Sequence, residues 1–364
     1  MQQGLNHWID RCVAGACLRP GVALQALRSA DLLRMRWGVG LQLVLPGLVL
    51  EPLAWCQSWM LRSRLQTLEL PDDPVVIIGH WRSGTTFLHQ LMAADPATAT
   101  ARNSLTIAPQ VALLLKPWLV PLLQRWMSPT RPIDAVPWSA EDPQEDEIGL
   151  ARLTFDTNMA GVAFPQQYLH HFRRCVLAST PEFERMLLQF TRLTWLHDGA
   201  GKRRLLIKNS THTARVPLLL RLFPRARFVL LHREPVQTVR SLVQVKQSLS
   251  DLVGLEDPLS DLAQVEETAE AHRHLMAAFD NARSLIPEGQ LVEVAYGDLV
   301  GDPLATVERI YGALRLGGWE QARLAVAARV AASRRYRARP VRLDPAAEER
   351  LQELMQPAGA VNVA

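Results

Sequence analysis

The chain has 364 residues, of which 48% are hydrophobic, so it is long enough to bury a large core in one α/β domain or two smaller ones. A total of 40 Lys and Arg against 36 Asp and Glu leaves a net charge of +4, which creates no dominant basic field and predicts no nucleic-acid partner. The 4 cysteines form no C-x-x-C pair and no zinc spacing with histidine, which favours reduced core thiols in a cytoplasmic protein without a metal.

The N-terminal region, residues 1–70, is predicted to be helical. Apolar residues recur at helical spacing over Leu5–Trp37, and Gly38–Leu50 is then almost wholly apolar. A spanning helix needs about 20 apolar residues, whereas this run is shorter and is interrupted by Pro46. The residues that follow are typical of membrane interfaces: Trp55, Trp59, Arg62 and Arg64. Two interpretations stay open, peripheral attachment to the inner face of the membrane and a helical subdomain packed on the core.

The core is predicted to extend over residues 71–316 and to begin with a buried parallel strand, Val75–Ile78. The Gly-containing turn Gly79–Gly84 follows, and from Gly84 the pattern is helical. The first N–H groups of a helix lack acceptors and the helix dipole favours negative charge there. A strand, a turn and a helix in this order therefore predict an anion site.

The spacing Gly79-x4-Gly84-Thr85-Thr86 is that of the Walker A loop, with one change. Thr85 stands where the loop of a P-loop kinase or NTPase has the lysine that reaches the phosphates. The cation lies inside the loop instead, at Arg82. A kinase or NTPase is therefore disfavoured, although it remains an alternative, as does an ordinary βα turn with a solvated arginine.

Arg82-Ser83-Gly84-Thr85-Thr86, after a hydrophobic strand and within IIGHWRSGTTFLHQLMAADP, resembles the phosphosulfate-binding loop of sulfotransferases. These enzymes use 3′-phosphoadenosine 5′-phosphosulfate (PAPS), and the string is similar to a bacterial branch with a GHWRSGTT loop. The resemblance implies a P-loop-like sulfotransferase fold, a central parallel sheet flanked by helices, with PAPS as sulfuryl donor and no metal. It also implies that the 5′-phosphosulfate is held by Arg82, by the N–H groups of Ser83, Gly84, Thr85, Thr86 and Phe87, and by the two threonine hydroxyls.

Two segments of unusual composition follow. Val111–Trp126 is apolar and contains Pro117 and Pro121; it is predicted to be too broken to span a bilayer and to line an acceptor pocket. Ser128–Glu147 is predicted to be a loop that ends in the carboxylates Glu141, Asp142, Glu145, Asp146 and Glu147. Such a run is typical of a solvated helix start. Because PQEDE after RPID also occurs in the resembled family, the alternative is that one carboxylate faces the active site.

A second strand is predicted at Arg203–Ile207, after a helix that a capping box at Ser179 and Glu182 starts and that ends near Asp198. Lys208 and His212 follow this strand. Open parallel sheets bind ligands beyond the carboxyl ends of their strands, so both residues are in a functional location. The helix Thr213–Phe223, the third strand Arg227–Leu231 and a further helix come next.

The third strand and the helix after it support the resemblance independently of the turn. In sulfotransferases an Arg just past a strand and a Ser eight residues later hold the 3′-phosphate, and Arg233 and Ser241 have this spacing. The resemblance also implies that Lys208 stabilises the leaving oxygen. Lys208-Asn209-Ser210 departs from the KSPPH expected there, whereas His212-Thr213-Ala214-Arg215 matches. The similarity extends over about Val75–Glu308.

An acceptor hydroxyl also needs a general base within hydrogen-bond reach. His212 is the first candidate, because it follows Lys208 closely and an imidazole titrates near neutral pH. Glu145 or Glu147 is the second, since other sulfotransferases use a carboxylate there. The acceptor is a small-molecule or lipid-like hydroxyl compound, and a non-catalytic member of the fold is the remaining alternative. The sequence leaves the oligomeric state open.

The C-terminal part is predicted to contain a helix over Asp261–Leu285, a fourth strand at Gln290–Val294 and a helix that starts at Asp302 and Pro303. Residues 317–364 are helical and basic, with six arginines from Arg329 to Arg342. These form either a solvated surface or a lid over the nucleotide phosphates. Asp344 caps the last helix, and residues 356–364 form a frayed tail.

Overall fold

The computed structural model describes residues 16–131, 136–333 and 342–356. Its centre is one sheet of parallel strands in the order β2-β3-β1-β4-β5. The strands are β1 (Val75–Ile78), β2 (Thr98–Ala99), β3 (Arg204–Lys208), β4 (Arg227–His232) and β5 (Leu291–Ala295). The predicted parallel α/β fold is thereby confirmed. The two-residue strand β2 was not predicted, because so short a segment carries no alternation of its own.

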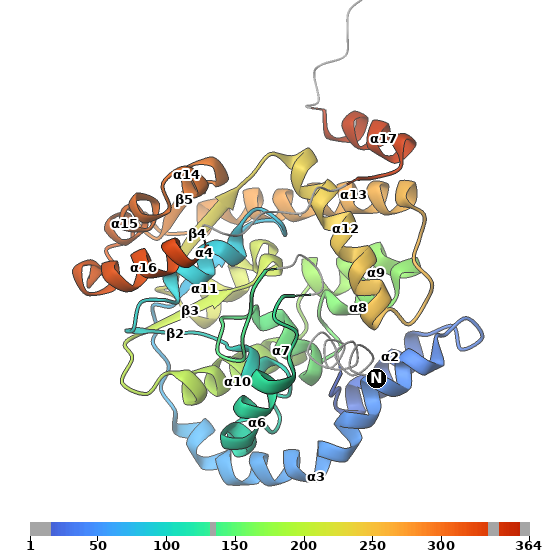
Figure 1. Ribbon diagram of the computed structural model, residues 1–364, viewed down its shortest axis with the longest axis horizontal. Coiled ribbons are helices and arrows are strands. Elements are labelled where there is room, and N and C mark those ends of the chain that lie inside the picture. The colour runs from blue at the N-terminus through green and yellow to red at the C-terminus, as the bar shows by residue number, and fades with distance from the viewer. Residues whose placement is uncertain (1–15, 132–135, 334–341, 357–364) are drawn as a thin grey trace, which may run out of the picture.

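Helices surround the sheet, as Figure 1 shows, with α3 along the lower edge and α17 at the opposite side. The α-helices before β3 are α2 (Pro20–Ser29), α3 (Trp37–Thr67), α4 (Thr85–Met92), α5 (Asn103–Thr106), α6 (Ala112–Trp126), α7 (Asp146–Leu153), α8 (Met159–Ala163), α9 (Tyr168–Phe172) and α10 (Pro181–Asp198). Those after β3 are α11 (Val216–Leu222), α12 (Pro235–Val253), α13 (Asp261–Ala282), α14 (Tyr296–Gly301), α15 (Pro303–Ala313), α16 (Trp319–Ser333) and α17 (Pro345–Met355). Short 3-10 or π turns are η1 (Pro165–Gln167), η2 (Arg173–Leu177), η3 (Ser210–Ala214) and η4 (Arg283–Leu285).

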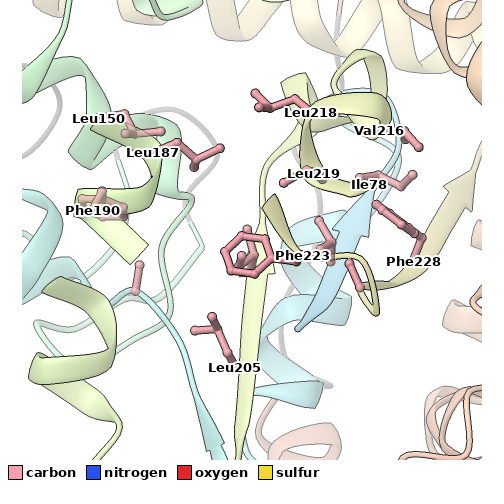
Figure 2. Packing of buried hydrophobic residues seen from close by; sticks show 14 of the residues in the cluster. Ile78, Leu150, Leu187, Phe190, Leu205, Val216, Leu218, Leu219, Phe223 and Phe228 are labelled. Carbon is pink, nitrogen blue, oxygen red and sulfur yellow. The ribbon is translucent and has the colours of Figure 1, made fainter. Parts of the chain in front are cut away.

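Both faces of the sheet are buried. Val76 and Ile78 of β1 pack with α10 and α11 on one face, where Figure 2 shows Leu187 and Phe190 on one side of the cluster and Leu218 and Leu219 on the other. The alternate residues of β1 pack against α4, α15 and α16 on the other face. Because successive side chains of a strand point to opposite faces, a strand covered on both faces must be apolar at every position. This explains the uninterrupted run of β-branched residues in β1.

Helix α3 corrects the expectation that proline breaks the N-terminal apolar run. It continues for 31 residues through Pro46 and Pro52, and Figure 1 shows it as an arc around the lower edge. A proline removes one helical hydrogen bond and kinks the helix, but packing holds the turns on both sides. Gly47 lies so close to the chain that an added Cβ would come within 1.9 Å of the Leu18 carbonyl oxygen.

The side chain of Gln57 fixes α3 to the start of α6. Its Nε2 donates to the carbonyl of Pro109 at 2.9 Å, and its Oε1 accepts from the backbone N–H groups of Leu113 and Leu114 at 2.9 and 3.0 Å. These N–H groups belong to the first turn of α6, where a helix has no acceptor of its own. Gln57 is thus the cap of a helix that begins more than fifty residues later.

Other boundaries differ from the predictions. Helix α6 also continues through both of its prolines. Thr180, rather than the predicted Ser179, caps α10 by accepting from the N–H of Phe183. The predicted helix from Thr213 is a 3-10 turn until Ala214, and α11 begins at Val216. The predicted caps at Asp302 and Asp344 are confirmed.

Cys56 is exposed on α3 and is not a core thiol, whereas Cys17 and Cys175 are buried as expected. Cys12, the arginines at 334, 335, 337 and 339, and the predicted tail from 357 lie outside the described residues.

A buried ion pair joins the sheet to the C-terminal helices. Asp95 follows α4 and is 1% exposed; its Oδ2 accepts from Arg204 of β3 and, at 2.8 Å, from the hydroxyl of Tyr311 in α15. Arg204 also donates to the carbonyl of Leu316 at 2.8 Å. Asp95 therefore neutralises a buried guanidinium on which three segments converge.

We expect Asp95→Asn to lower the free energy of unfolding by about 3–5 kcal/mol, because it leaves the buried cation of Arg204 without its carboxylate. The matched control is Asp72→Asn, which removes the partner of Arg225 in a pair whose side chains are 60% and 64% exposed. That change should cost less than about 1 kcal/mol. Urea unfolding of the three proteins checks this, and equal costs for the two variants would contradict it.

Candidate functional site

The turn between β1 and α4 begins and ends at glycines that the backbone requires. Gly79 has φ 132°, and a Cβ there would lie 2.5 Å from the carbonyl oxygen of Leu231 in β4. Gly84 has φ 99°, and a Cβ there would lie 2.6 Å from the ring of Tyr296. Left-handed backbone favours glycine, and an absent side chain lets the chain approach closely. The two glycines hold the turn tightly against β4 and α14.

Arg82 lies at the centre of this turn and joins it to α12. It has φ 69°, a conformation that costs a non-glycine residue about 1–2 kcal/mol. Its Nε donates to the hydroxyl of Ser241 at 2.9 Å, and its carbonyl accepts from Nη1 of Arg233 at 2.9 Å. Arg82, Arg233 and Ser241, hereafter the arginine–serine cluster, therefore meet although about 150 residues separate them.

Arg233 is held by three kinds of contact. Besides its bond to Arg82, its Nη2 donates to Gln237 at 3.2 Å, and its guanidinium lies 4.3 Å from the ring centroid of Tyr296. Its Nε is buried and has no hydrogen-bond partner among the described residues. The sequence did not single out Tyr296, since a tyrosine after a strand carries no signal of a stacked arginine.

The first turn of α4 faces the same space. Within the turn, the N–H of Ser83 donates to His80 and the N–H of Phe87 donates to Gly84, so two of the five predicted donors already have acceptors. Thr85 and Thr86 are the first two residues of α4, and helix geometry gives their N–H groups no acceptor in the helix. The dipole of α4 adds partial positive charge at this point.

Lys208 ends β3 and points to a carboxylate of the acidic segment. Its Nζ donates to Oε2 of Glu145 at 2.5 Å, and Oε1 of Glu145 accepts from the N–H of Ser210 at 3.1 Å. Lys208 is 4% exposed. The hydroxyl of Ser210 is buried and has no partner among the described residues.

His212 lies behind this pair. It is fully buried, its Nε2 is 3.1 Å from Oδ2 of Asp146, and it is not among the described residues that line the cavity. The structure thus brings Lys208 and Glu145 together and places His212 one layer deeper, against the first turn of α7.

Glu147 has a full set of partners. It accepts from the side chains of Asn209, Thr211 and Arg215 and from the N–H of Asn158. Burial alone would raise the pKa of Glu147, but the cation of Arg215 and the hydrogen bond from Asn209 outweigh it, so the pKa is lowered. The acidic segment is therefore buried at Asp146 and Glu147, which corrects the expectation of a solvated helix start.

These elements enclose one cavity of about 1330 Å³. It brings together most of the residues that the sequence predicted for the site: Arg82, Gly84, Thr85, Thr86, Phe87, Glu145, Glu147, Lys208, Arg233 and Ser241. None of the described residues of α6 lines it, so this cavity gives no support to the prediction that Val111–Trp126 lines an acceptor pocket. Arg329 does line it and donates to Asp142 at 3.3 Å, whereas Arg342 is exposed.

Histidines next to the turn are neutral because they are buried. Burial lowers the pKa of His80 to about 3, and neighbouring His272, whose ring centroid is 4.6 Å away, adds to the lowering. Burial also holds the pKa of His89 well below its ordinary value, with Lys208 and Arg102 adding to the effect. His89 donates to or accepts from the hydroxyl of Thr100 at 2.7 Å. Among the described residues, no three His, Cys, Asp or Glu side chains are grouped to hold a metal ion.

Comparison with known proteins shows the family to which the chain belongs. A family model described as "Sulfotransferase family" matches residues 74–321. Omega-hydroxy-beta-dihydromenaquinone-9 sulfotransferase Stf3 of Mycobacterium bovis and of Mycobacterium tuberculosis is 27% identical over 287 residues, which cover 78% of this chain and 74% of the relative.

Solved structures share the fold. Sulfotransferase STF1 from Mycobacterium tuberculosis matches with a TM-score of 0.65 at 19% identity, covering 92% of this chain and 90% of that one. Sulfotransferase STF9 from Mycobacterium avium matches with a TM-score of 0.63 at 19% identity, covering 77% and 74%. The resemblance inferred from the turn and from Arg233 and Ser241 is thereby confirmed at the level of family and fold.

The buried histidines predict that the protein loses stability in mild acid. Below about pH 6.5 the unfolded chain binds protons at His80 and His89 that the folded chain does not, so proton uptake favours unfolding. Each such histidine lowers the free energy of unfolding by about 1.4 kcal/mol per pH unit. Urea unfolding between pH 7 and pH 5 should show this decline, and His80→Gln should reduce its slope. His274→Gln, at an exposed position, serves as the control; a wild-type stability that is flat over this interval would contradict the prediction.

Proposed function

Because the chain belongs to the sulfotransferase family and is a sulfotransferase, we propose that its sulfuryl donor is PAPS and that its acceptor group is a hydroxyl. The observation that carries the proposal is the arginine–serine cluster beside the first turn of α4. One cavity then offers two arginines, a serine and the N–H groups of a helix start, which suits a nucleotide with phosphate groups at both its 5′ and its 3′ side.

The residues present fit this donor. Gly79 and Gly84 let the turn lie tightly against β4 and α14, and Thr85 and Thr86 at the start of α4 present N–H groups and hydroxyls. The buried Nε of Arg233 lacks an acceptor among the described residues, which a phosphate oxygen would supply. Arg82 and the start of α4 would hold the 5′-phosphosulfate, and Arg233 and Ser241 the 3′-phosphate.

When bound, the donor supplies an electrophilic sulfur atom and a phosphate leaving group. Transfer of this kind passes through a loose, in-line transition state, so fixed positive charge and positioning carry most of the catalysis. Arg82 and the N–H groups of α4 would stabilise charge on the transferred group. Lys208 would stabilise the oxygen that departs, since its ammonium lies in the same cavity.

We assign the general base to Glu145 rather than to His212. Glu145 lines the cavity and accepts from Lys208 and from the N–H of Ser210. His212 is fully buried against Asp146. Glu147 already accepts four hydrogen bonds and serves better as a support for the strand end. Glu145 would take the acceptor proton as Lys208 turns toward the leaving oxygen.

A second candidate, phosphoryl transfer by a P-loop kinase, finds less support. Thr85 stands at the position of the phosphate-binding lysine, and the family match is to sulfotransferases. A non-catalytic role is likewise disfavoured, since the cations and the carboxylate for transfer are all present in one cavity.

The acceptor that we propose is a hydroxyl on an apolar, lipid-like molecule. The curated relative is named for a menaquinone derivative with an omega-hydroxy group. We further propose that the protein is cytoplasmic and meets such acceptors at the inner face of the membrane, through the N-terminal helices of residues 1–70. Arg329 of α16 lines the cavity and would add positive charge near the nucleotide.

Helix α3 supplies the surface for that contact. By length and composition it is the helix among the described residues that could cross a membrane, and 28% of its most apolar stretch is buried. Val39, Leu43 and Ala54 pack inward, while Val49, Trp55 and Trp59 are 76%, 68% and 79% exposed. A helix with one face on the protein and one apolar face outward suits an interfacial position, with Arg62 and Arg64 near lipid head groups.

Arg233→Ala should weaken binding of adenosine 3′,5′-bisphosphate by about 1.5–3 kcal/mol, because a charge-assisted contact to phosphate is lost. Binding of adenosine 5′-monophosphate, which lacks the 3′-phosphate, should change far less. Calorimetry with both ligands checks this, with Arg283→Ala at an exposed site as the matched control. Equal losses for the two nucleotides would refute the assignment.

The double variant Trp55→Ser/Trp59→Ser should lose membrane binding, because it removes the two largest exposed apolar groups of α3. Flotation with liposomes that contain anionic phosphatidylglycerol measures this: wild type should float, less so at high salt, and the variant should remain below. Leu324→Ser, which removes an 81% exposed leucine from α16, should float like wild type. Wild-type protein that stays at the bottom would rule out the membrane proposal.

A further inference from the structure

The cavity extends well beyond the arginine–serine cluster, along α12. Leu252 lies 11 residues after Ser241 on this helix, a distance of about 16 Å at the helical rise. Side chains of α8 and α12 line this part of the cavity, here called the apolar arm: Met159, Val162, Leu242, Val245, Leu249 and Leu252. These side chains give the arm an apolar wall that suits the hydrocarbon chain or ring system of a second ligand beside the nucleotide.

One cation lies in the wall of this arm. Lys246 of α12 lines the cavity and is 5% exposed. Its Nζ lies 3.3 Å from the ring centroid of Tyr168 in α9 and donates to the hydroxyl of Thr268 in α13 at 3.2 Å. Tyr168 lines the cavity too and is 1% exposed. The ammonium is thus fixed by an aromatic face and a hydroxyl, at the edge of an apolar space.

The two lysines that line the cavity, Lys208 and Lys246, differ in how their positive charge is balanced. Lys208 is paired with Glu145. Among the salt bridges of the described residues none includes Lys246. Burying an ammonium costs free energy unless a counter-charge or several hydrogen bonds offset the loss of water. The carboxylate of Glu267 on α13 attracts Lys246, although it forms no salt bridge with it among the described residues. Together with a ring face and one hydroxyl it offsets only part of this cost, so the site is complementary to a further anion.

We propose that Lys246 and Tyr168 form a binding subsite for a carboxylate-type oxyanion carried on an apolar molecule, whose hydrocarbon part occupies the apolar arm. The inference rests on the proposed function in one respect, that this molecule is the sulfuryl acceptor. It deepens that function by naming the acceptor class: an amphipathic compound with a hydroxyl at the reacting end and an acidic group at Lys246.

The electrostatic surroundings of Lys246 make the subsite sensitive to pH. Burial lowers the pKa of Lys246 to about 7, and the carboxylate of Glu267 on α13 acts in the opposite direction. Glu267 itself has a pKa raised by burial, with Lys246 lowering it and Glu270 raising it further. Tyr168, on α9, is the other titratable group in contact, and burial raises its pKa. An anion beside Lys246 should therefore bind best where the amine is protonated.

The test uses octanoate and 1-octanol, which share an apolar chain and differ in the carboxylate. Calorimetry with the full-length protein should show octanoate binding at least about 10-fold more tightly than octanol at pH 6.5. Above about pH 7 the octanoate affinity should fall toward 10-fold per pH unit as Lys246 loses its proton. Octanol should show no such dependence.

Two variants separate the charge from the packing. Lys246→Met keeps an unbranched side chain and should abolish both the preference for octanoate and its pH dependence. Lys246→Arg should keep the preference but lose the decline above pH 7, because a guanidinium stays charged. A purely structural lysine would give no difference in pH profile between the two variants.

Adenosine 3′,5′-bisphosphate, measured in the same samples, distinguishes this inference from the proposed donor site. Its affinity should be unchanged in both variants. Failure of wild type to bind octanoate, an unchanged preference in Lys246→Met, or an equal loss of nucleotide affinity would each overturn the subsite. Octanoate binding without any nucleotide binding would instead leave the subsite standing and refute the donor assignment.

Discussion

The parallel pairing of β1 with β3 on one side and β4 on the other is the constraint on which the site depends. In register, Ile77 is opposite Lys208 and Ile78 is opposite Leu230, so the three strands end at the same edge. The turn after β1, Lys208 at the end of β3 and Arg233 just past β4 are thereby brought into one space. Backbone pairing sets the register of these segments, and the contacts of Arg82 with Ser241 and Arg233 join two of them further.

Three consecutive carboxylates at the start of α7 make different contacts. Glu145 faces the cavity and pairs with Lys208, Asp146 holds His212, and Glu147 binds the 209–215 turn. Because a helix turns by 100° per residue, neighbouring side chains at its start point in different directions. Glu145 balances the charge of Lys208, so the cavity holds a neutral pair at its proposed reacting end. The partly buried guanidinium groups of Arg82 and Arg233 lie where the nucleotide phosphates are proposed to bind.

Local patterns in the sequence predicted the turn and every strand except β2, because each depends on neighbouring residues, and the resemblance to sulfotransferases pointed to Arg233 and Ser241. What they could not predict depends on packing across the chain. Whether His212 or Glu145 enters the cavity is decided by how Glu145 and Asp146 lie against Lys208 and His212, which follow more than sixty residues later. The prolines of α3 and α6 obey a local rule that tertiary packing overrides. Lys246 carries no signal at all, since a lysine on an amphipathic helix is ordinarily solvated.

The bond network of Gln57 has a consequence for biosynthesis. Its partners, Pro109, Leu113 and Leu114, are translated 52 to 57 residues later. At a synthesis rate of about 5–20 residues per second, α3 waits for roughly 3–11 seconds before α6 can cover it. During that interval both its inward and its outward apolar faces are open to water. The order of synthesis therefore leaves α3 without the helix that its Gln57 caps, and the hydrogen bonds between the two helices form only after α6 has been made.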